Sequence, residues 1–280
     1  MVPFVELPTL RLGPIAVDPF STLVVIGVLV GVVVARRRCV TTGLDPIFGE
    51  RLMWHAIGIG FVLSHVLDVL AYHPEQVLED PLVLLRVWGS QSSFAGMLGG
   101  LLGMAFFFAR HGGHLDLRER LAYVDTIAYG FPFAWIFGRL GCTFALDHPG
   151  ALTSFPLGTS LATASARAFL RSVYAEAGRL ADLPGDETLA RLGFHNLGFY
   201  ELLYTVGVIV PAMLLLGRKP RTPGFFLAAF LLLYAPIRFV ADFLRVGDRT
   251  YAGLTFGQYA ALALTFAAAY LVHRTRHASR

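Results

Sequence analysis

The segment Phe137 to Gly150 reads FGRLGCTFALDHPG and marks the point at which a long apolar stretch gives way to the longest polar connection in the chain. Its glycines permit close approach of other groups to the backbone. Within ten residues it carries an arginine, a thiol, an aspartate and a histidine, at Arg139, Cys142, Asp147 and His148. Ionisable side chains at the edge of an apolar segment are functional candidates by default. We therefore expect the activity of this protein at this segment.

The composition of the chain is that of a membrane protein. Its 280 residues are 55% hydrophobic and only 15% charged, whereas a soluble chain carries about 25% charged residues. The net charge is +4 and the cations are scattered between apolar stretches. Because no basic face accumulates, we expect no nucleic-acid partner. The two cysteines, Cys39 and Cys142, provide no disulfide framework, and the sequence predicts no cofactor and no resident metal ion.

Seven apolar stretches approach the length of about 17 to 25 residues that a helix needs to cross roughly 30 Å of hydrocarbon. Each must be helical, because lipid offers no hydrogen-bond partners to the backbone. The predicted fold is therefore all-α, a polytopic single integral membrane domain over residues 1–280. The predicted spans are 20–35, 53–72, 94–109, 121–137, 197–216, 224–243 and 254–272.

The connection 138–196, inserted between spans four and five, is too long to be a simple turn. We predict a small external subdomain there. Residues 164–178 are predicted to form a helix whose apolar side chains share one face, namely Phe169, Leu170, Val173 and Tyr174. That face suits either a helix lying on the lipid surface or one packed in a capping subdomain.

The distribution of basic residues predicts the orientation of the chain. The connections after spans one, three and five, together with the C-terminal tail, hold 13 Lys and Arg, whereas the short segments on the other side hold four. Cytoplasmic loops carry the excess of such residues. The N-terminus is therefore predicted outside and the C-terminus in the cytoplasm.

In this orientation, most of the unusual polar residues fall at one depth, in the outer half of the membrane. A charged group inside a span costs about 2.5 to 3.5 kcal/mol and usually faces a cavity or a partner. We therefore predict a polar cavity open to the outer leaflet, where a lipid headgroup enters sideways. Its candidate residues are His65, Arg139, Cys142, Asp147, His148, Tyr200, Glu201, Tyr234, Arg238, Asp242, Arg245 and Gln258.

Three of these residues, Arg238, Asp242 and Arg245, stand at i, i+4 and i+7 and are predicted to share one helical face. Two guanidinium groups separated by a carboxylate suit a phosphodiester, and the alternative is an intrahelical ion pair. Arg139 would add a third cation, or else it snorkels at a helix end.

His148 also has two interpretations. A histidine beside proline in an exposed turn is usually a turn residue, but its unperturbed pKa of about 6.5 also suits a base near neutral pH. His65 with Asp68, three residues later, is either part of the cavity or a satisfied intramembrane pair.

Four motifs occur in a fixed order along the chain: Gly138-Arg139-Leu140-Gly141 followed by Asp147 and Gly150, Tyr200-Glu201, RFVADFLR from Arg238 to Arg245, and LTFGQ from Leu254 to Gln258. Together they resemble the bacterial prolipoprotein diacylglyceryl transferase family, and the resemblance runs from Phe20 to about Gln258. That family has seven spans and an outward N-terminus.

The resemblance implies transfer of the diacylglyceryl group of phosphatidylglycerol to the thiol of the lipobox cysteine in a prolipoprotein signal peptide. It places the protein in the bacterial cytoplasmic (inner) membrane, in contact with the lipid bilayer, with the active site at the outer leaflet. Arg139 and Arg238 would hold the phosphate, and Asp147 and Asp242 would stand at glutamate positions of the family. Substrate contacts are expected from Gly141, Cys142, Gly150, Tyr200, Glu201, Tyr234, Arg245, Gln258 and His65.

The chain departs from the family at three further positions. Ala95 replaces the family's histidine, Cys142 its asparagine, and Phe20 the tyrosine that opens span one. A thiol with an ordinary pKa of about 8.5 is only a few per cent ionised at pH 7, so the acceptor requires a base. We hypothesise that His148 substitutes for the missing histidine.

Three other functions compete with this interpretation. The first is a relative that lost catalytic activity when Ala95 replaced the histidine and that binds lipid or handles lipoproteins without turnover. The second is a transferase with a different acceptor, which the sequence does not distinguish because nothing in it identifies the acceptor groove. A transporter or channel would need polar residues through the full depth of the membrane, and the inner half offers little beyond Asp125.

Overall fold

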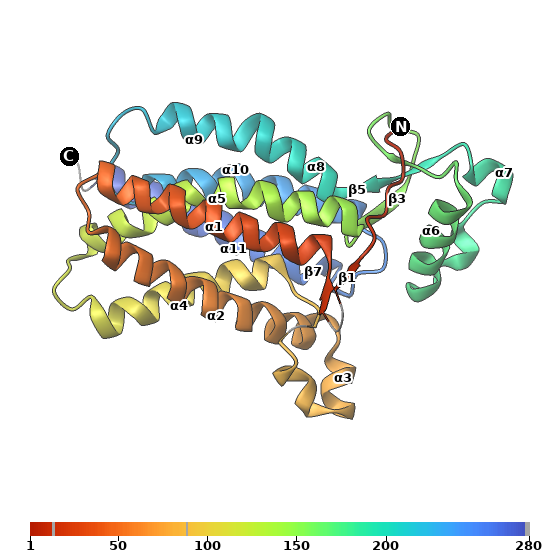
Figure 1. Ribbon diagram of the computed structural model, residues 1–280, viewed down its shortest axis with the longest axis horizontal. Coiled ribbons are helices and arrows are strands. Elements are labelled where there is room, and N and C mark those ends of the chain that lie inside the picture. The colour runs from red at the N-terminus through yellow and green to blue at the C-terminus, as the bar shows by residue number, and fades with distance from the viewer. Residues whose placement is uncertain (13–14, 88, 278–280) are drawn as a thin grey trace. The chain divides into compact units, whose positions relative to one another are not determined.

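The computed structural model describes residues 1–12, 15–87 and 89–277, and helices make up most of this part of the chain (Figure 1). Arg280, one of the basic residues counted in the C-terminal tail, lies outside the described residues.

Among the described residues, five helices are long and apolar enough to cross a membrane. They are α1 (Pro19–Thr41), α2 (Pro46–Tyr72), the continuous helix of α8 (Leu197–Tyr204), η3 (Thr205–Ile209) and α9 (Val210–Leu216), the helix of α10 (Phe225–Ala241) and η4 (Asp242–Leu244), and α11 (Phe256–His277). They correspond to predicted spans one, two, five, six and seven. The chain is therefore a multi-pass membrane protein.

The other two predicted spans also coincide with helices, α4 (Ser93–His111) and α5 (Leu117–Ala145). Helix α5 ends well beyond the predicted end at Phe137, and Leu146, with φ of +55°, is the residue at which the helical conformation stops. Arg139 and Cys142 consequently lie on the last turns of a helix and not in the connection that follows it.

Several helices begin at capping signals that the sequence carries openly. Asp18 Oδ1 accepts a hydrogen bond from Ser21 N at 2.8 Å, and Asp45 Oδ1 accepts one from Ile47 N at 2.8 Å. In both cases a proline follows the aspartate at the first helical position, where its missing N–H has no partner to lose. These caps fix where α1 and α2 begin.

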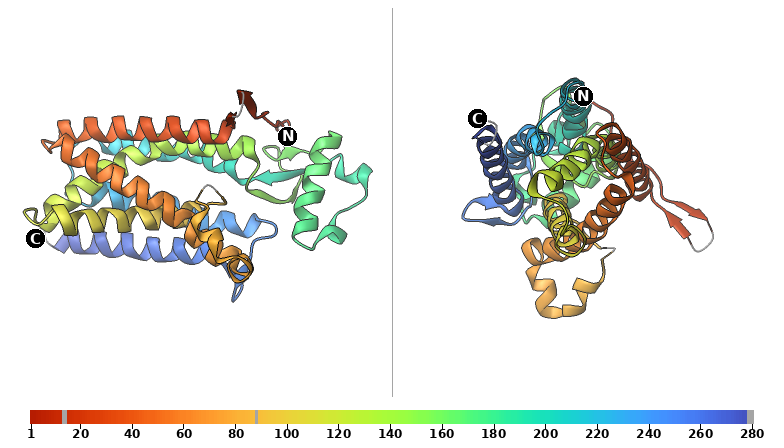
Figure 2. Two further views of the ribbon diagram at one scale, coloured as in Figure 1. Left: turned by 60° about the horizontal axis from the view of Figure 1, so that its bottom comes forward. Right: turned by 90° about the vertical axis from the view of Figure 1, so that its left-hand side faces the viewer.

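The chain divides into two compact units, and each is described by itself. The first comprises residues 31–131, 213–239 and 249–280. Within it, α2 and α4 pack along one another (Figures 1 and 2). Glycines permit this approach, since a Cβ on Gly99 would lie 2.8 Å from Leu63 Cβ and one on Gly103 would lie 2.9 Å from the His55 carbonyl oxygen. Short elements follow these helices: α3 (Pro74–Glu79), η1 (Pro81–Leu85) and the hairpin of β6 (Thr250–Tyr251) and β7 (Leu254–Thr255).

The second unit comprises residues 1–30, 132–212 and 240–248. It contains the hairpin of β1 (Leu10–Leu12) and β2 (Ile15–Val17), and an antiparallel sheet of order β3-β5-β4, formed by β3 (Pro149–Thr153), β5 (Gly193–Asn196) and β4 (Thr159–Ser160). Beside the sheet lie α6 (Ala164–Glu176), η2 (Leu180–Asp182) and α7 (Asp186–Leu189). The all-α prediction missed these strands, because strands of two to five residues leave no alternating pattern to detect.

The helix predicted at 164–178 is present as α6, and its apolar face is covered. Leu170 is fully buried in a cluster with Leu161, Leu189 and Phe194. The polar side carries Arg171, whose guanidinium lies 2.6 Å from Asp186 Oδ1. Of the two alternatives for this helix, the packed subdomain therefore describes α6, and its apolar face is not available to lie on lipid.

Candidate active site

Arg139, on the last turns of α5, is a buried cation of the second unit, with 1% of its side chain exposed. Its Nε lies 3.0 Å from Glu201 Oε2, and its guanidinium carbon lies 4.3 Å from the ring centre of Trp135. Its Nη1 donates to Cys142 Sγ at 3.5 Å. A buried guanidinium held on three sides has a fixed direction, which suits recognition of an anion.

Glu201 reaches Arg139 because the start of α8 packs tightly against the end of α5. The N-cap residue Asn196 accepts from Phe199 N at 3.2 Å and donates to the Thr143 carbonyl at 3.1 Å, linking the two helix ends. A Cβ on Gly198 would lie 2.9 Å from the carbonyl carbon of Cys142, so only glycine permits this contact without a shift.

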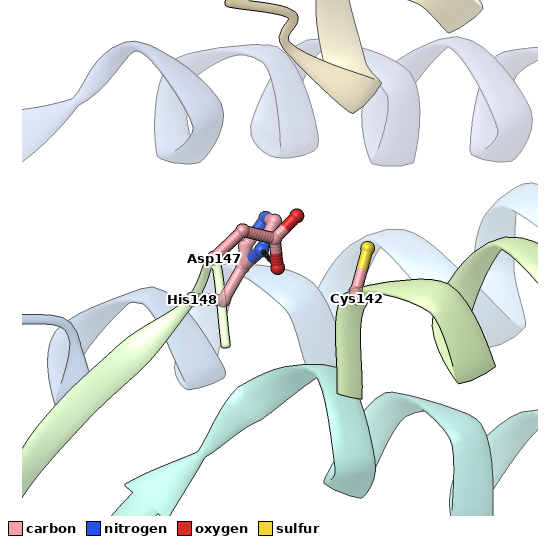
Figure 3. A group of neighbouring side chains, drawn as sticks. All are labelled: Cys142, Asp147 and His148. Atoms are coloured by element: carbon pink, nitrogen blue, oxygen red, sulfur yellow. Dashed lines mark hydrogen bonds and ion pairs between the residues drawn. The ribbon is translucent and has the colours of Figure 1, made fainter. Parts of the chain in front are cut away.

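Asp147 and His148 follow directly on α5. Leu146 has φ of +55°, a left-handed conformation that ends the helix. His148 Nδ1 and Asp147 Oδ1 form a short hydrogen bond. We assign the imidazole proton to Nδ1 from this contact, which leaves Nε2 as the basic nitrogen. A ligating atom of each of Cys142, Asp147 and His148 lies within 4.8 Å of the other two, and Figure 3 shows the three side chains on the same side of the backbone.

The surroundings shift the pKa values of this pair. Burial lowers the pKa of His148, with a further lowering from the Arg245 and Arg139 charges, while the Asp147 carboxylate opposes it. For Asp147, burial acts to raise the pKa, but His148 and Arg139 outweigh it and hold the pKa below its ordinary value. The Asp147 side chain keeps 35% exposure, so neighbouring charges decide the direction. Near neutral pH the pair is therefore a carboxylate beside a neutral imidazole.

Arg245 joins the same unit, but not by the predicted helical face. Helix α10 ends at Ala241 and is followed by the single 3₁₀ turn Asp242–Leu244, so Arg245 has extended backbone with φ of −71° and ψ of 151°. The prediction that Arg238, Asp242 and Arg245 form one helical stripe is therefore wrong for Arg245. Its Nε lies 3.0 Å from Asp248 Oδ2, and its Nη1 lies 3.9 Å from the buried Asp242.

Gly150 lies where three backbone segments meet. It forms a β-bridge with Arg245, and the neighbouring Pro149 pairs with Asn196. A Cβ at this position would lie 2.8 Å from His195 Cβ and 2.8 Å from the Leu244 carbonyl oxygen. Glycine is needed here because of space and not because of a positive φ.

We therefore expect the substitution Gly150→Ala to destabilise the second unit by about 1 to 3 kcal/mol through overpacking. The unfolding temperature of the detergent-solubilised protein measures this effect. Gly207→Ala is the matched control, since a Cβ there meets nothing within 4 Å and the residue is helical. Equal unfolding temperatures for the two variants would contradict the steric account.

Four predicted site residues belong to the first unit. Arg238 and Tyr234 are buried on α10, and Tyr234 stacks on Phe230. Gln258 forms a capping box with Thr255 at the start of α11, with bonds of 2.9 and 3.1 Å. The ring nitrogens of His65 each lie 2.9 Å from a backbone carbonyl oxygen, of Ser90 and Val83. Gln258 and His65 thus have structural contacts, and a substrate role for these four remains a prediction.

Sequence reasoning missed three partners of the site. Trp135 stands four residues before Arg139, a spacing that puts both on one helical face. Asp248 pairs with Arg245, and His195 Nδ1 lies 2.9 Å from the Tyr200 hydroxyl. The Trp135 spacing and the Thr255–Gln258 box are both visible in the sequence, whereas the other two contacts depend on the loops. Cys39 and Cys142 are both free and buried.

Comparison with known proteins gives consistent matches over this region. The family model described as "Prolipoprotein diacylglyceryl transferase" matches residues 8–274. A phosphatidylglycerol–prolipoprotein diacylglyceryl transferase of Chromohalobacter salexigens is 29% identical over 265 residues, which cover 91% of this chain and 87% of that protein. A protein of the same name from Bordetella bronchiseptica is 28% identical over 95% of this chain and 94% of that protein. One from Thermus thermophilus is 32% identical over 53% of this chain and 52% of that protein. The matched residues of the family model include every candidate site residue.

Proposed function

Because this chain belongs to the prolipoprotein diacylglyceryl transferase family, we propose that it transfers the diacylglyceryl group of phosphatidylglycerol to the lipobox cysteine of a prolipoprotein. The acceptor sulfur attacks the glyceryl carbon bonded to the phosphate oxygen. A C–S bond forms, the C–O bond breaks, and glycerol phosphate leaves with the bonding electron pair. The observation that carries the proposal is the buried Arg139, held by Glu201 beside Cys142 and the Asp147–His148 pair.

Arg139 is proposed to stabilise the leaving phosphate. The phosphodiester carries one negative charge, and the departing glycerol phosphate gains a second as the C–O bond breaks. A cation already held in place favours the more charged transition state over the bound lipid, and this difference lowers the barrier. Its ion pair with Glu201 and its contact with Trp135 hold the guanidinium without reorganisation.

The remaining predicted residues receive supporting roles in the proposal. Arg238 is proposed to bind the lipid phosphate, Glu201 to orient Arg139, and Asp242 to orient Arg245. The Arg245 contacts with Asp242 and Asp248 support a similar positioning role. Residues proposed to contact substrate are Gly141, Cys142, Gly150, Tyr200, Tyr234, Gln258 and His65.

The Asp147–His148 pair is proposed to activate the acceptor thiol in place of the histidine that the family carries where this chain has Ala95. Ala95 is fully buried and its side chain is apolar. Asp147 holds His148 in the tautomer with a basic Nε2, the arrangement that a general base requires. In this proposal the pair supplies the group that takes the thiol proton.

The proposed function is tested by incubating the purified protein with phosphatidylglycerol and a lipobox peptide. Mass spectrometry should find the peptide heavier by one diacylglyceryl group, and glycerol phosphate should appear in equal amount. The buried Ala95 favours the second candidate, a lipid-binding relative without turnover. That candidate predicts binding of phosphatidylglycerol with an unchanged peptide mass.

The proposal also places seven spans in the bacterial cytoplasmic membrane, with the N-terminus outside, the C-terminus in the cytoplasm and the site at the outer leaflet. Helices α4 and α5 would be the third and fourth spans. The excess of basic residues in the connections 110–120 and 217–223 and in the C-terminal tail supports this orientation.

We expect a membrane-impermeant maleimide added to spheroplasts to label Leu78→Cys but not Arg118→Cys. Leu78 is 87% exposed, and Arg118 is exposed as well, so both thiols are reactive wherever the reagent reaches them. The two native cysteines are buried. After permeabilisation both variants should label equally. Labelling of Arg118→Cys alone in intact spheroplasts would reverse the proposed orientation.

A further inference from the structure

We infer that Cys142, Asp147 and His148 form a binding site for a thiophilic divalent metal ion, with Zn²⁺ as the best fit, and that the ion presents the acceptor sulfur as a thiolate. This inference rests on the proposed function for the identity of the acceptor. It changes one step of that function: with the ion bound, Asp147 and His148 activate the thiol as metal ligands, and water takes the proton in place of His148.

The ligand set is that of a catalytic zinc site. Such sites use three protein ligands drawn from cysteine, histidine and carboxylate, and leave the fourth tetrahedral position to water or substrate. Here a sulfur, a ring nitrogen and a carboxylate oxygen all lie within 4.8 Å of one another. Ligand atoms around tetrahedral zinc are about 3.3 to 3.8 Å apart. The upper bound of 4.8 Å exceeds that range by about 1 Å.

The position of each ligand favours the ion. Cys142 is buried on α5, and the chain reverses at Leu146 so that Asp147 and His148 return toward it. Asp147 retains 35% and His148 13% side-chain exposure, which gives an ion and an acceptor a path to the site. On binding, the hydrogen bond between Asp147 and His148 is exchanged for two metal bonds.

The charges around the cluster permit a cation. Arg139 lies 3.5 Å from the Cys142 sulfur, but its charge is matched by Glu201 at 3.0 Å. Arg245 contacts both Asp242 and Asp248, so two carboxylates offset its single positive charge. The carboxylate of Asp147 and the thiolate of Cys142 then supply two negative charges for a divalent ion, so the loaded cluster is locally neutral.

A metal ion explains two departures from the family pattern at once. Cys142 replaces the asparagine and supplies the soft ligand that zinc prefers, and the ion compensates for Ala95. A thiol that binds zinc loses its proton outright. The acceptor S–H proton passes to water, the metal-bound sulfur displaces glycerol phosphate from the glyceryl carbon, and the neutral thioether then leaves the ion. No oxidant or reductant takes part.

The site is tested first by substitution with Co²⁺, whose bonds to sulfur absorb in the near ultraviolet. The full-length protein in detergent micelles, freed of metal with a chelator, should bind one Co²⁺ per chain and show this absorption. Cys142→Ser should abolish the sulfur band, whereas the matched variant Cys39→Ser should retain it, because Cys39 is buried in the other unit. The band should grow when a lipobox peptide adds a second sulfur. A Co²⁺ spectrum without a sulfur band, or one unchanged by Cys142→Ser, would overturn the site.

Transfer activity then tests the role of the ion. The chelated protein should transfer at least about 10-fold more slowly than the same protein reloaded with Zn²⁺, in line with the effects of weakening metal sites elsewhere. Equal rates with and without Zn²⁺, or inhibition by stoichiometric Zn²⁺, would overturn the catalytic role and leave the proposed transferase function intact. If no preparation transfers lipid, the proposed function fails, and the Co²⁺ spectrum still decides whether the metal site exists.

Discussion

Replacement of Arg139 by glutamine should lower the rate of diacylglyceryl transfer by about 10²- to 10³-fold at saturating phosphatidylglycerol, the cost of removing one preorganised group that stabilises transition-state charge. Glutamine retains hydrogen-bonding ability but has neither the charge nor the forked guanidinium. Because the effect falls on the transition state, turnover should drop more than lipid affinity. Lysine at this position should not rescue activity, since it cannot keep the contacts with Glu201, Trp135 and Cys142 together.

The same substitution should also destabilise the protein, and this effect must be separated from catalysis. Breaking a buried pair by removing one partner costs about 3 to 5 kcal/mol, and Glu201 has only 4% of its side chain exposed. The double variant Arg139→Gln/Glu201→Gln removes the unpaired carboxylate and should recover stability without recovering transfer. Arg179→Gln is the control, because its ion pair with Asp182 is on the surface. Recovery of transfer in the double variant would mean that Arg139 acts only on the fold.

The second large effect is expected at His148. His148→Ala should reduce transfer by about 10²- to 10⁴-fold, the usual contribution of a positioned proton acceptor. Mass spectrometry of the lipobox peptide measures it. Unfolding temperature should fall by less than in Arg139→Gln, because the direct hydrogen bond of the imidazole is to the partly exposed Asp147.

The control for this experiment is His73→Ala, at a histidine with 42% of its side chain exposed, in the other unit. That variant should transfer at the parental rate. An assay with a synthetic acceptor supplied as thiolate at high pH should restore part of the activity of His148→Ala, because the missing step is removal of the thiol proton. Full activity of His148→Ala near neutral pH would exclude this residue from the mechanism.

The helices of this protein are predictable from sequence because each depends on local information. Length and apolar composition mark the spans, and Asp18-Pro19 and Asp45-Pro46 mark two starts. The far end of α5 was not predictable in the same way. Arg139 and Cys142 look like connection residues on hydropathy, yet the helix continues because Glu201 and Asn196, some sixty residues later, satisfy groups at its end.

The same reasoning applies to the site. The motifs identified Arg139, Glu201 and Asp147, and the structure brings these three into one unit. The helical spacing did not predict the position of Arg245. The α-helix ends at Ala241, and Arg245 forms a β-bridge with Gly150. Such long-range backbone pairing has no signature in local periodicity. The motif order that resembles the family was more informative about this site than any single spacing.

One carboxylate in the first unit has a consequence for how α10 faces its neighbours. Asp125 of α5 accepts hydrogen bonds from Gly224 N and Leu227 N, both at 2.9 Å, at the start of α10. A helix turns by about 100° for each residue. The residue at which α10 starts therefore determines the direction about the helix axis in which Arg238 points, three and a half turns later. Asp125 pins that starting residue. The loop 217–223 can therefore gain or lose a residue without changing the direction of the Arg238 side chain. An insertion between Leu227 and Arg238 would rotate that side chain about the helix axis.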